Sequence, residues 1–168
     1  MESDPGRHDA TPRQARFAGN APAVLPVVLH VDDDPNDAEL LKAACHAIDA
    51  PIILKTVPDG DSALDYLQGQ GEYRDRNAFP LPSLILLDLK MPRRTGFEVL
   101  EWIRMQPALN RVRVLILTGS ELKDDILRAT LGGADGYLVK PLLFESLVNV
   151  VRSVMSTLSE GTKASDGR

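Results

Sequence analysis

Residues 84–88 read Leu-Ile-Leu-Leu-Asp, a run of four apolar residues that ends in a carboxylate. A short apolar run without polar alternation is typical of a strand that is buried on both faces, as in a parallel sheet covered by helices. Further runs of the same kind lie at 27–31, 52–57, 112–117 and 137–139. The sequence therefore predicts five parallel strands.

Amphipathic segments separate these runs and predict five helices. They cover about 35–48, a segment starting near 59, 95–105, 121–131 and 142–158. Asp34 is expected to cap the first helix, and Pro35 to occupy its first position. Strands that alternate with helices predict an α/β fold. Five of them favour flavodoxin-like winding, with strand order 2-1-3-4-5 and helices on both faces of the sheet.

Length and composition predict one folded domain. The chain has 168 residues, of which 43% are hydrophobic and 26% charged, as in ordinary globular proteins. We expect the domain to span 24–159, between a flexible lead at 1–23 and a flexible tail at 160–168. Residues 69–82 are expected to form a long surface loop, for which solvation is favoured over a binding role.

Several classes of protein are disfavoured by the same data. The net charge of −5 gives no support to nucleic-acid binding. No apolar run approaches the length of a membrane span, and residues 1–20 lack the apolar core of a secretory signal. Cys45 is the only cysteine, is expected to be buried, and is compatible with a reducing compartment. We therefore expect a cytoplasmic protein that binds neither nucleic acid nor membranes.

Polar side chains stand where four of the five apolar runs end. The set is Asp32, Asp33, Asp88, Thr118 and Lys140. The carboxyl ends of parallel strands share one edge of the sheet, where ligands bind, so these side chains are expected to meet. Two carboxylates 4 Å apart repel by about 4 kcal/mol at an effective dielectric of about 20. A hard divalent cation relieves this repulsion, and Mg²⁺ suits a site shared with phosphate. A carboxylate there can then be phosphorylated, with Lys140 and Thr118 contacting phosphoryl oxygens.

The motifs around these positions resemble a known family. They are Asp32-Asp33, the stretch from Leu86 to Met91-Pro92, Gly96, Thr118 and Lys140-Pro141. Together they resemble the receiver domain of two-component response regulators, the CheY-like family, over residues 26 to about 158. The resemblance implies a phosphoprotein, with Asp88 as the acceptor of a phosphoryl group from a histidine of a sensor kinase.

The resemblance also assigns the other site residues. Asp33 and Asp88 would ligate Mg²⁺ or Mn²⁺ by their side chains, Lys90 by its backbone carbonyl group, and Asp32 through water. Thr118 and Tyr137 would form the switch pair that responds to phosphorylation. Lys140 would bind the phosphoryl group, and the peptide bond between Lys140 and Pro141 would be cis.

Two departures from the family pattern leave details open. Thr95 stands where receivers usually carry Asp, so the hydrogen bonding of that loop is uncertain. Lys90 and Ser120 occupy positions that vary in the family and tune the lifetime of the phosphoryl group.

The implied function is that of a single-domain response regulator without an output domain of its own. It would be a switch and not an enzyme beyond its own phosphorylation chemistry, acting on an unknown downstream protein. Residues 67–73, Leu-Gln-Gly-Gln-Gly-Glu-Tyr, resemble regulators associated with phytochrome-type sensor kinases. A phosphotransfer intermediate and a degenerate scaffold receiver remain as alternatives.

Two unrelated functions fit the sequence less well. A haloacid-dehalogenase phosphohydrolase needs a second Asp two residues after its nucleophile, where this chain has Lys90. A flavin or nucleotide carrier needs a Gly-rich loop after its first strand, where this chain has Asp32-Asp33-Asp34-Pro35.

Two further features have competing interpretations. His30 lies within the first strand, and a packed strand residue is favoured over a ligand or base. The last helix carries an apolar arc of roughly 160°, wider than the ~100° stripe of an ordinary surface helix. Either the arc is a broad core contact, or part of it, with Val148 and Met155 at the edge, stays uncovered and forms a homodimer or partner surface.

Overall fold

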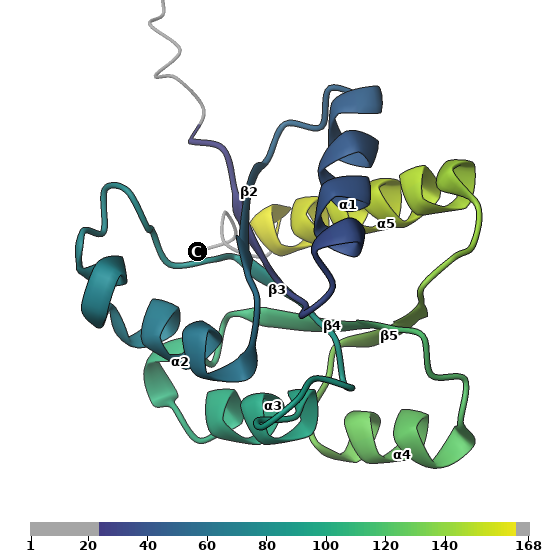
Figure 1. Ribbon diagram of the computed structural model, residues 1–168. Helices are drawn as coiled ribbons and strands as arrows, with labels where there is room; N and C mark the ends of the chain where they lie inside the picture. The colour runs from purple at the N-terminus through teal and green to yellow at the C-terminus, as the bar shows by residue number, and fades with distance from the viewer. Residues whose placement is uncertain (1–23, 164–168) are drawn as a thin grey trace, which may run out of the picture.

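The computed structural model describes residues 24–163, which form one five-stranded parallel sheet in the order β2-β1-β3-β4-β5 (Figure 1). The strands are β1 (Val27–Val31), β2 (Ile53–Val57), β3 (Leu84–Leu87), β4 (Arg113–Thr118) and β5 (Gly136–Val139). The α-helices are α1 (Pro35–Ala47), α2 (Gly60–Gln68), α3 (Gly96–Arg104), α4 (Lys123–Leu131) and α5 (Phe144–Lys163). The predicted fold class and strand order are confirmed. The expected lead at 1–23 lies outside the described residues, as does most of the expected tail, although α5 continues past 159 to Lys163.

Helices cover both faces of the sheet, as predicted. Helices α1 and α5 lie on one face and α2, α3 and α4 on the other (Figure 1). Each face has its own apolar core because the side chains of a strand point alternately to the two sides. In β3, Ile85 and Leu87 join the core under α2 and α3, and Leu84 and Leu86 join the core under α1 and α5.

The strand register places the functional edge. Val31 at the end of β1 pairs with Leu87 at the end of β3, so the next residues, Asp32 and Asp88, emerge side by side. The first turn of α1 follows at once and is capped as predicted, since the backbone N–H of Asn36 donates to the Asp34 carboxylate at 2.8 Å. This cap fixes the path of the chain away from the edge.

The segment 69–82 lies on the surface but is more ordered than the predicted solvated loop. It contains a 3₁₀-helix, η1 (Gly71–Arg74), and the rings of Tyr73 and Phe79 pack against Tyr66 of α2. The Arg76 guanidinium group donates hydrogen bonds to the backbone carbonyls of Tyr66, Leu67 and Phe79 at 2.7–3.1 Å. The segment is therefore a surface loop, as predicted, and it is anchored to the end of α2 by Arg76 and by its two partly buried aromatic rings.

The apolar arc of α5 is covered in part. Val148 is 9% exposed and packs with Val151 and Val154 in the core under α1. Of the two alternatives left open, the broad core contact therefore holds for Val148. The physical reason is that α1 packs along α5 and covers this side. Met155 is partly buried against the same core. The exposed apolar residues lie instead at and just before the start of α5, at Leu142, Leu143 and Phe144.

Two further findings concern the backbone and the helices. No peptide bond within the described residues is cis, so the expectation of a cis bond before Pro141 is wrong for this structure. The trans form is the intrinsically favoured one even before proline. Among residues 24–163, no helix is long and apolar enough to cross a membrane.

Candidate functional site

The acidic residues predicted from the strand ends meet at one point. Carboxylate oxygens of Asp32, Asp33 and Asp88 lie within 4.8 Å of one another. Asp32 and Asp88 are buried, and Asp33 is exposed. The register of β1 and β3 brings them together across more than fifty residues of sequence.

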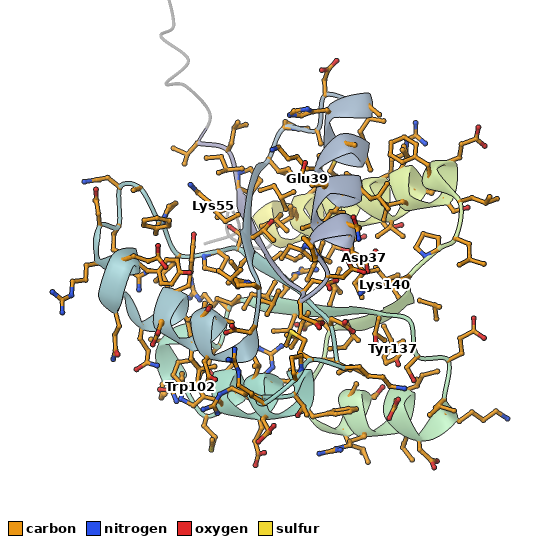
Figure 2. All side chains as sticks on the ribbon, viewed as in Figure 1. Asp37, Glu39, Lys55, Trp102, Tyr137 and Lys140 are labelled. Atoms are coloured by element: carbon orange, nitrogen blue, oxygen red, sulfur yellow. The ribbon has the colours of Figure 1, made fainter. Side chains whose placement is uncertain are left out.

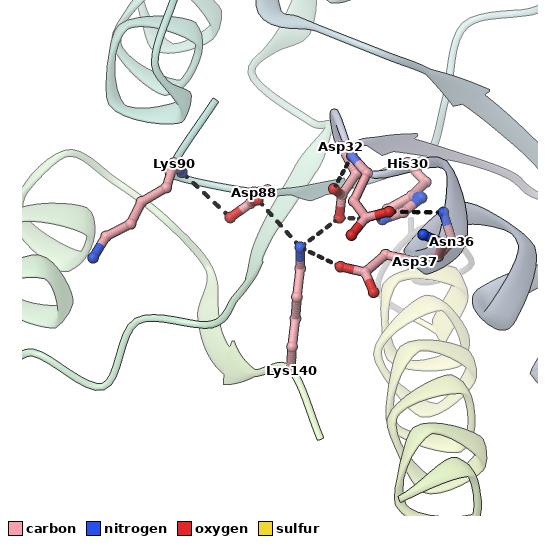
Figure 3. Close-up of polar contacts among 8 residues, drawn as sticks. His30, Asp32, Asn36, Asp37, Asp88, Lys90 and Lys140 are labelled. Carbon is pink, nitrogen blue, oxygen red and sulfur yellow. Dashed lines mark hydrogen bonds and ion pairs between the residues drawn. The ribbon is translucent and has the colours of Figure 1, made fainter. Parts of the chain in front are cut away.

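Lys140, which follows β5, completes this cluster. Its ammonium nitrogen lies 2.7 Å from Oδ2 of Asp32 and 3.2 Å from Oδ2 of Asp88 (Figure 3). Burial works to lower the pKa of Lys140, but its contacts with the carboxylates of Asp32 and Asp37 and the charge of Asp88 outweigh burial and raise the pKa. Lys140 is therefore a permanent positive charge at the acidic edge.

The carboxylate of Asp32 is held from two further sides. Its Oδ1 accepts a hydrogen bond from the backbone N–H of Asp34 at 3.0 Å, and its Oδ2 lies 3.3 Å from Nε2 of His30. Burial works to raise the pKa of Asp32, but the contacts with His30 and Lys140 lower it overall. Asp32 is therefore held as an anion in a fixed position.

Two residues of this site were not identified from the sequence. His30 is a packed strand residue, as predicted, but its contact with Asp32 was missed. The available signal was the spacing of two, which puts both residues on one face of an extended chain. Asp37 of α1 was missed entirely, yet its Oδ2 lies 2.7 Å from the ammonium nitrogen of Lys140, and the two side chains point toward one another (Figure 2).

The loop after β3 surrounds Asp88. The backbone N–H of Lys90 donates to Oδ1 of Asp88 at 3.3 Å, while the Lys90 side chain extends outward to within 3.8 Å of Asp125. A Cβ atom at Gly96 would lie 2.1 Å from the carbonyl oxygen of Asp88, so only glycine allows this close approach. Thr95, which stands where receivers usually carry Asp, forms a capping box with Glu98 at the start of α3. This capping box is the hydrogen bonding of the loop that the sequence left open.

The two predicted switch residues have different environments. The Thr118 hydroxyl group at the end of β4 is buried and has no hydrogen-bond partner. The Tyr137 hydroxyl group donates to the backbone carbonyl of Ser120 at 3.0 Å. Burial, above all, raises the pKa of Tyr137. The hydroxyl group of Thr118 is thus free to bond with a ligand at the edge.

The donor set fits a divalent cation. Asp32, Asp33 and Asp88 supply hard oxygen ligands. Lys140, whose ammonium group contacts Asp32, Asp37 and Asp88, contributes only one positive charge to this group of acids. The remaining negative charge is costly at these separations unless a cation balances it. Oxygen donors of this kind select hard divalent ions over softer metals.

Comparison with known proteins agrees with this geometry. The sequence matches the family model of the response regulator receiver domain over residues 28–152. It is 36% identical over 132 residues to the response regulator Rcp1 of Synechocystis sp. (strain ATCC 27184 / PCC 6803 / Kazusa), covering 77% of this chain and 86% of Rcp1.

Solved structures show the same likeness. The phosphorylated cyanobacterial phytochrome response regulator RcpA superposes with a TM-score of 0.71 and 32% identity, covering 78% of this chain and 91% of RcpA. The Mn²⁺-bound form of Rcp1 gives a TM-score of 0.69 and 34% identity, over 78% of this chain and 92% of Rcp1. The fold, the acidic edge and these matches together show that this chain belongs to the response regulator receiver domain family, the CheY-like signalling switches of two-component systems.

Proposed function

We propose that this protein is a cytoplasmic phosphorylation switch that accepts a phosphoryl group on Asp88 from a histidine of a sensor kinase. One observation carries the proposal: Asp88 is buried beside Asp32 and Asp33, with the ammonium nitrogen of Lys140 at 3.2 Å. A carboxylate in this setting is held in place as a nucleophile, and the charge that a phosphoryl group adds can be balanced. The receiver is proposed to span residues 24–159.

Each site residue has a proposed role. A carboxylate oxygen of Asp88 bonds to phosphorus while the bond from phosphorus to the kinase histidine breaks. The side chains of Asp33 and Asp88, the Lys90 carbonyl group and, through water, Asp32 would hold Mg²⁺ or Mn²⁺. When bound, the cation supplies positive charge to the transferring phosphoryl oxygens.

Two further groups of this chain contact the phosphoryl group in the proposal. Lys140 forms an ion pair with one phosphoryl oxygen. Thr118, whose buried hydroxyl group has no other hydrogen-bond partner, donates to a second. Its movement toward that oxygen is coupled to a rearrangement of Tyr137, which changes the surface around β5.

The acceptor assignment is tested with acetyl phosphate as phosphoryl donor in the presence of Mg²⁺. The acyl phosphate is trapped with borohydride, and the modified residue is identified by mass spectrometry. We expect modification at Asp88 only, and none in Asp88→Asn. Asp34→Asn is the matched control, because Asn also caps a helix and Asp34 lies outside the cluster. Modification of Asp32, or undiminished modification of Asp88→Asn, would refute the assignment.

A phytochrome-type sensor kinase is the proposed phosphoryl donor. The support is the similarity to the phytochrome response regulator RcpA and to Rcp1, together with the resemblance of residues 67–73 to regulators associated with phytochrome-type kinases. Transfer from a purified, phosphorylated phytochrome-type kinase should exceed transfer from a chemotaxis-type kinase under equal conditions. Equal rates from both would contradict the choice of donor.

The partner surface is proposed to lie over α4, β5 and the start of α5. Its exposed apolar residues are Leu122, Leu127, Leu131, Val139, Leu142, Leu143 and Phe144. Exposed apolar groups gathered on one side commonly mark an association surface. Self-association through this surface should rise on phosphorylation, so light scattering should give a larger mass with beryllofluoride, a phosphoryl mimic. The increase should be lost in Leu127→Glu; a mass that never changes argues against a homodimer.

A further inference from the structure

Three carboxylates lie close to the ammonium nitrogen of Lys140. The nitrogen lies 2.7 Å from Asp32, 2.7 Å from Asp37 and 3.2 Å from Asp88 (Figure 3). The ammonium group donates hydrogen bonds to Asp37 and Asp88 and forms an ion pair with Asp32, so three negative charges share its one positive charge. A phosphoryl oxygen that binds Lys140 must therefore displace or weaken one of these contacts.

Asp37 differs from the other two carboxylates. Its side chain is 34% exposed, whereas those of Asp32 and Asp88 are 0% and 7% exposed. It lies in the first turn of α1, where the helix dipole favours a negative charge. Water can solvate Asp37 when Lys140 leaves it, but a buried carboxylate that loses its cation pays a large desolvation cost. Asp37 is thus the contact that Lys140 can most easily give up.

Asp37 also lies outside the group of three carboxylates that fits a metal ion. Its negative charge therefore acts on the site without being neutralised by direct ligation. It draws Lys140 away from Asp88 in the resting state, and its field disfavours any anion that approaches the same position.

We propose that Asp37 is a positioning residue that retains Lys140 in the resting state and competes with the phosphoryl group for it. The role rests on the proposed function, since it concerns phosphoryl binding at Asp88. Asp37 sets the balance of the site between two ligands of opposite charge. With Asp37 charged, part of the Lys140 charge is neutralised, which favours the cation and disfavours the phosphoryl group.

The removal of this charge has effects of opposite sign on the two ligands. In Asp37→Asn, Lys140 forms stronger ion pairs with Asp32 and Asp88, and their negative charge is then less available to a cation. Mg²⁺ alone should therefore bind more weakly by about three- to tenfold. Lys140 is also free to contact an anion, so beryllofluoride at saturating Mg²⁺ should bind more tightly by about three- to tenfold. Local disruption of α1 would instead weaken both.

Isothermal titration calorimetry of the full chain measures both affinities. Asp37→Glu keeps the charge and should restore most of the wild-type balance. Glu39→Gln is the matched control, because it removes one charge from the same helix (Figure 2). The side chain of Glu39 is 77% exposed and pairs with Lys42. We expect Glu39→Gln to change neither affinity by more than about twofold. In a Lys140→Met background, Asp37→Asn should weaken Mg²⁺ binding much less, because only the direct field of Asp37 then remains.

The outcomes separate this role from others. Opposite shifts in Asp37→Asn, absent in Glu39→Gln, support it. Unchanged affinities, or a loss of both, overturn it and leave Asp37 as a structural residue of α1. A wild-type protein that binds neither Mg²⁺ nor beryllofluoride contradicts the proposed function, and this inference with it.

Discussion

The hydroxyl group of Tyr137 donates a hydrogen bond to the backbone carbonyl of Ser120 at 3.0 Å. This bond joins β5 to the segment after β4, two residues beyond Thr118. The Thr118 hydroxyl group itself has no hydrogen-bond partner. The two residues of the proposed switch pair are therefore in different states at rest, since one is bonded to the loop and the other is available to a phosphoryl oxygen.

We expect Tyr137→Phe to loosen this loop and to lower the free energy of unfolding by about 0.5–1.5 kcal/mol. The backbone amide resonances of residues 119–122 should then lie part of the way toward their beryllofluoride-bound positions. Tyr66→Phe is the matched control, because that hydroxyl group also donates to a backbone carbonyl, that of Pro80, at 2.9 Å. The control should lose similar stability without shifting these resonances. If they stay at their resting positions in Tyr137→Phe, Tyr137 does not restrain the loop.

The metal-binding role of Asp33 predicts a selective loss of affinity. Asp33→Asn removes one anionic ligand of the three and should weaken Mg²⁺ binding by about tenfold or more, measured by calorimetry. Asp34→Asn should have little effect, because the neighbouring side chain caps α1 and Asn caps equally well. Equal Mg²⁺ affinity in Asp33→Asn and wild type would remove Asp33 from the site.

The close approach of Gly96 to the backbone of Asp88 predicts that a larger residue at this position destabilises the loop after β3. A Cβ atom there would meet the carbonyl oxygen of Asp88 at 2.1 Å and Cα of Leu89 at 2.8 Å, and backbone atoms cannot rotate away. Gly96→Ala should therefore lower the free energy of unfolding by about 1–3 kcal/mol and slow the phosphorylation of Asp88. Gly119→Ala is the control, since nothing lies within 4 Å of its Cβ position. Equal urea midpoints for the two variants would show that the loop accommodates the additional Cβ atom without a loss of stability.

The carboxylate of Asp59 is expected to contribute to the free energy of unfolding in a way that depends on pH. Its carboxylate caps α2 by accepting from the backbone N–H of Ser62 at 2.7 Å, and it pairs with Arg93 at 2.8 Å. The Ser62 hydrogen bond is the main cause that lowers the pKa of Asp59. A carboxylate with a lowered folded-state pKa stabilises the fold above its unfolded pKa of about 3.9, and this contribution is lost as the pH falls through the folded value.

Asp59→Ser keeps a capping side chain but removes the charge. We expect it to cost about 0.5–1 kcal/mol at pH 7, measured by urea unfolding, and less at about pH 3, below the unfolded pKa of about 3.9, because the stabilising effect of the charge falls with the pH there. A difference between variant and wild type that is the same at both pH values would contradict the role of the charge.

Much of the architecture could be predicted from local sequence. Apolar runs of four or five residues, such as 84–87, are typical of strands that are buried on both faces. Asp34 and Asp59 stand where α1 and α2 begin. The acidic edge followed from topology, because parallel strands end on the same side wherever their residues stand in the chain.

Other features depended on how distant elements pack. The burial of Val148 was decided by the contact of α1 with α5, and the periodicity of α5 carries no information about what covers it. The order of segment 69–82 came from Arg76, which found three carbonyl groups that only the folded end of α2 and its own loop present together.

The sequence by itself determined which residues stand at the functional edge, because strand ends are set by local patterns of apolar and polar residues. The tertiary structure alone decided that Asp37 reaches Lys140, which lies 103 positions away, and that three carboxylates surround one ammonium group. The physical reason is that an ion pair requires its two atoms to meet within about 4 Å. The packing of α1 and α5 on the sheet fixes the position of the first turn of α1 relative to the end of β5. No local sequence pattern encodes this packing.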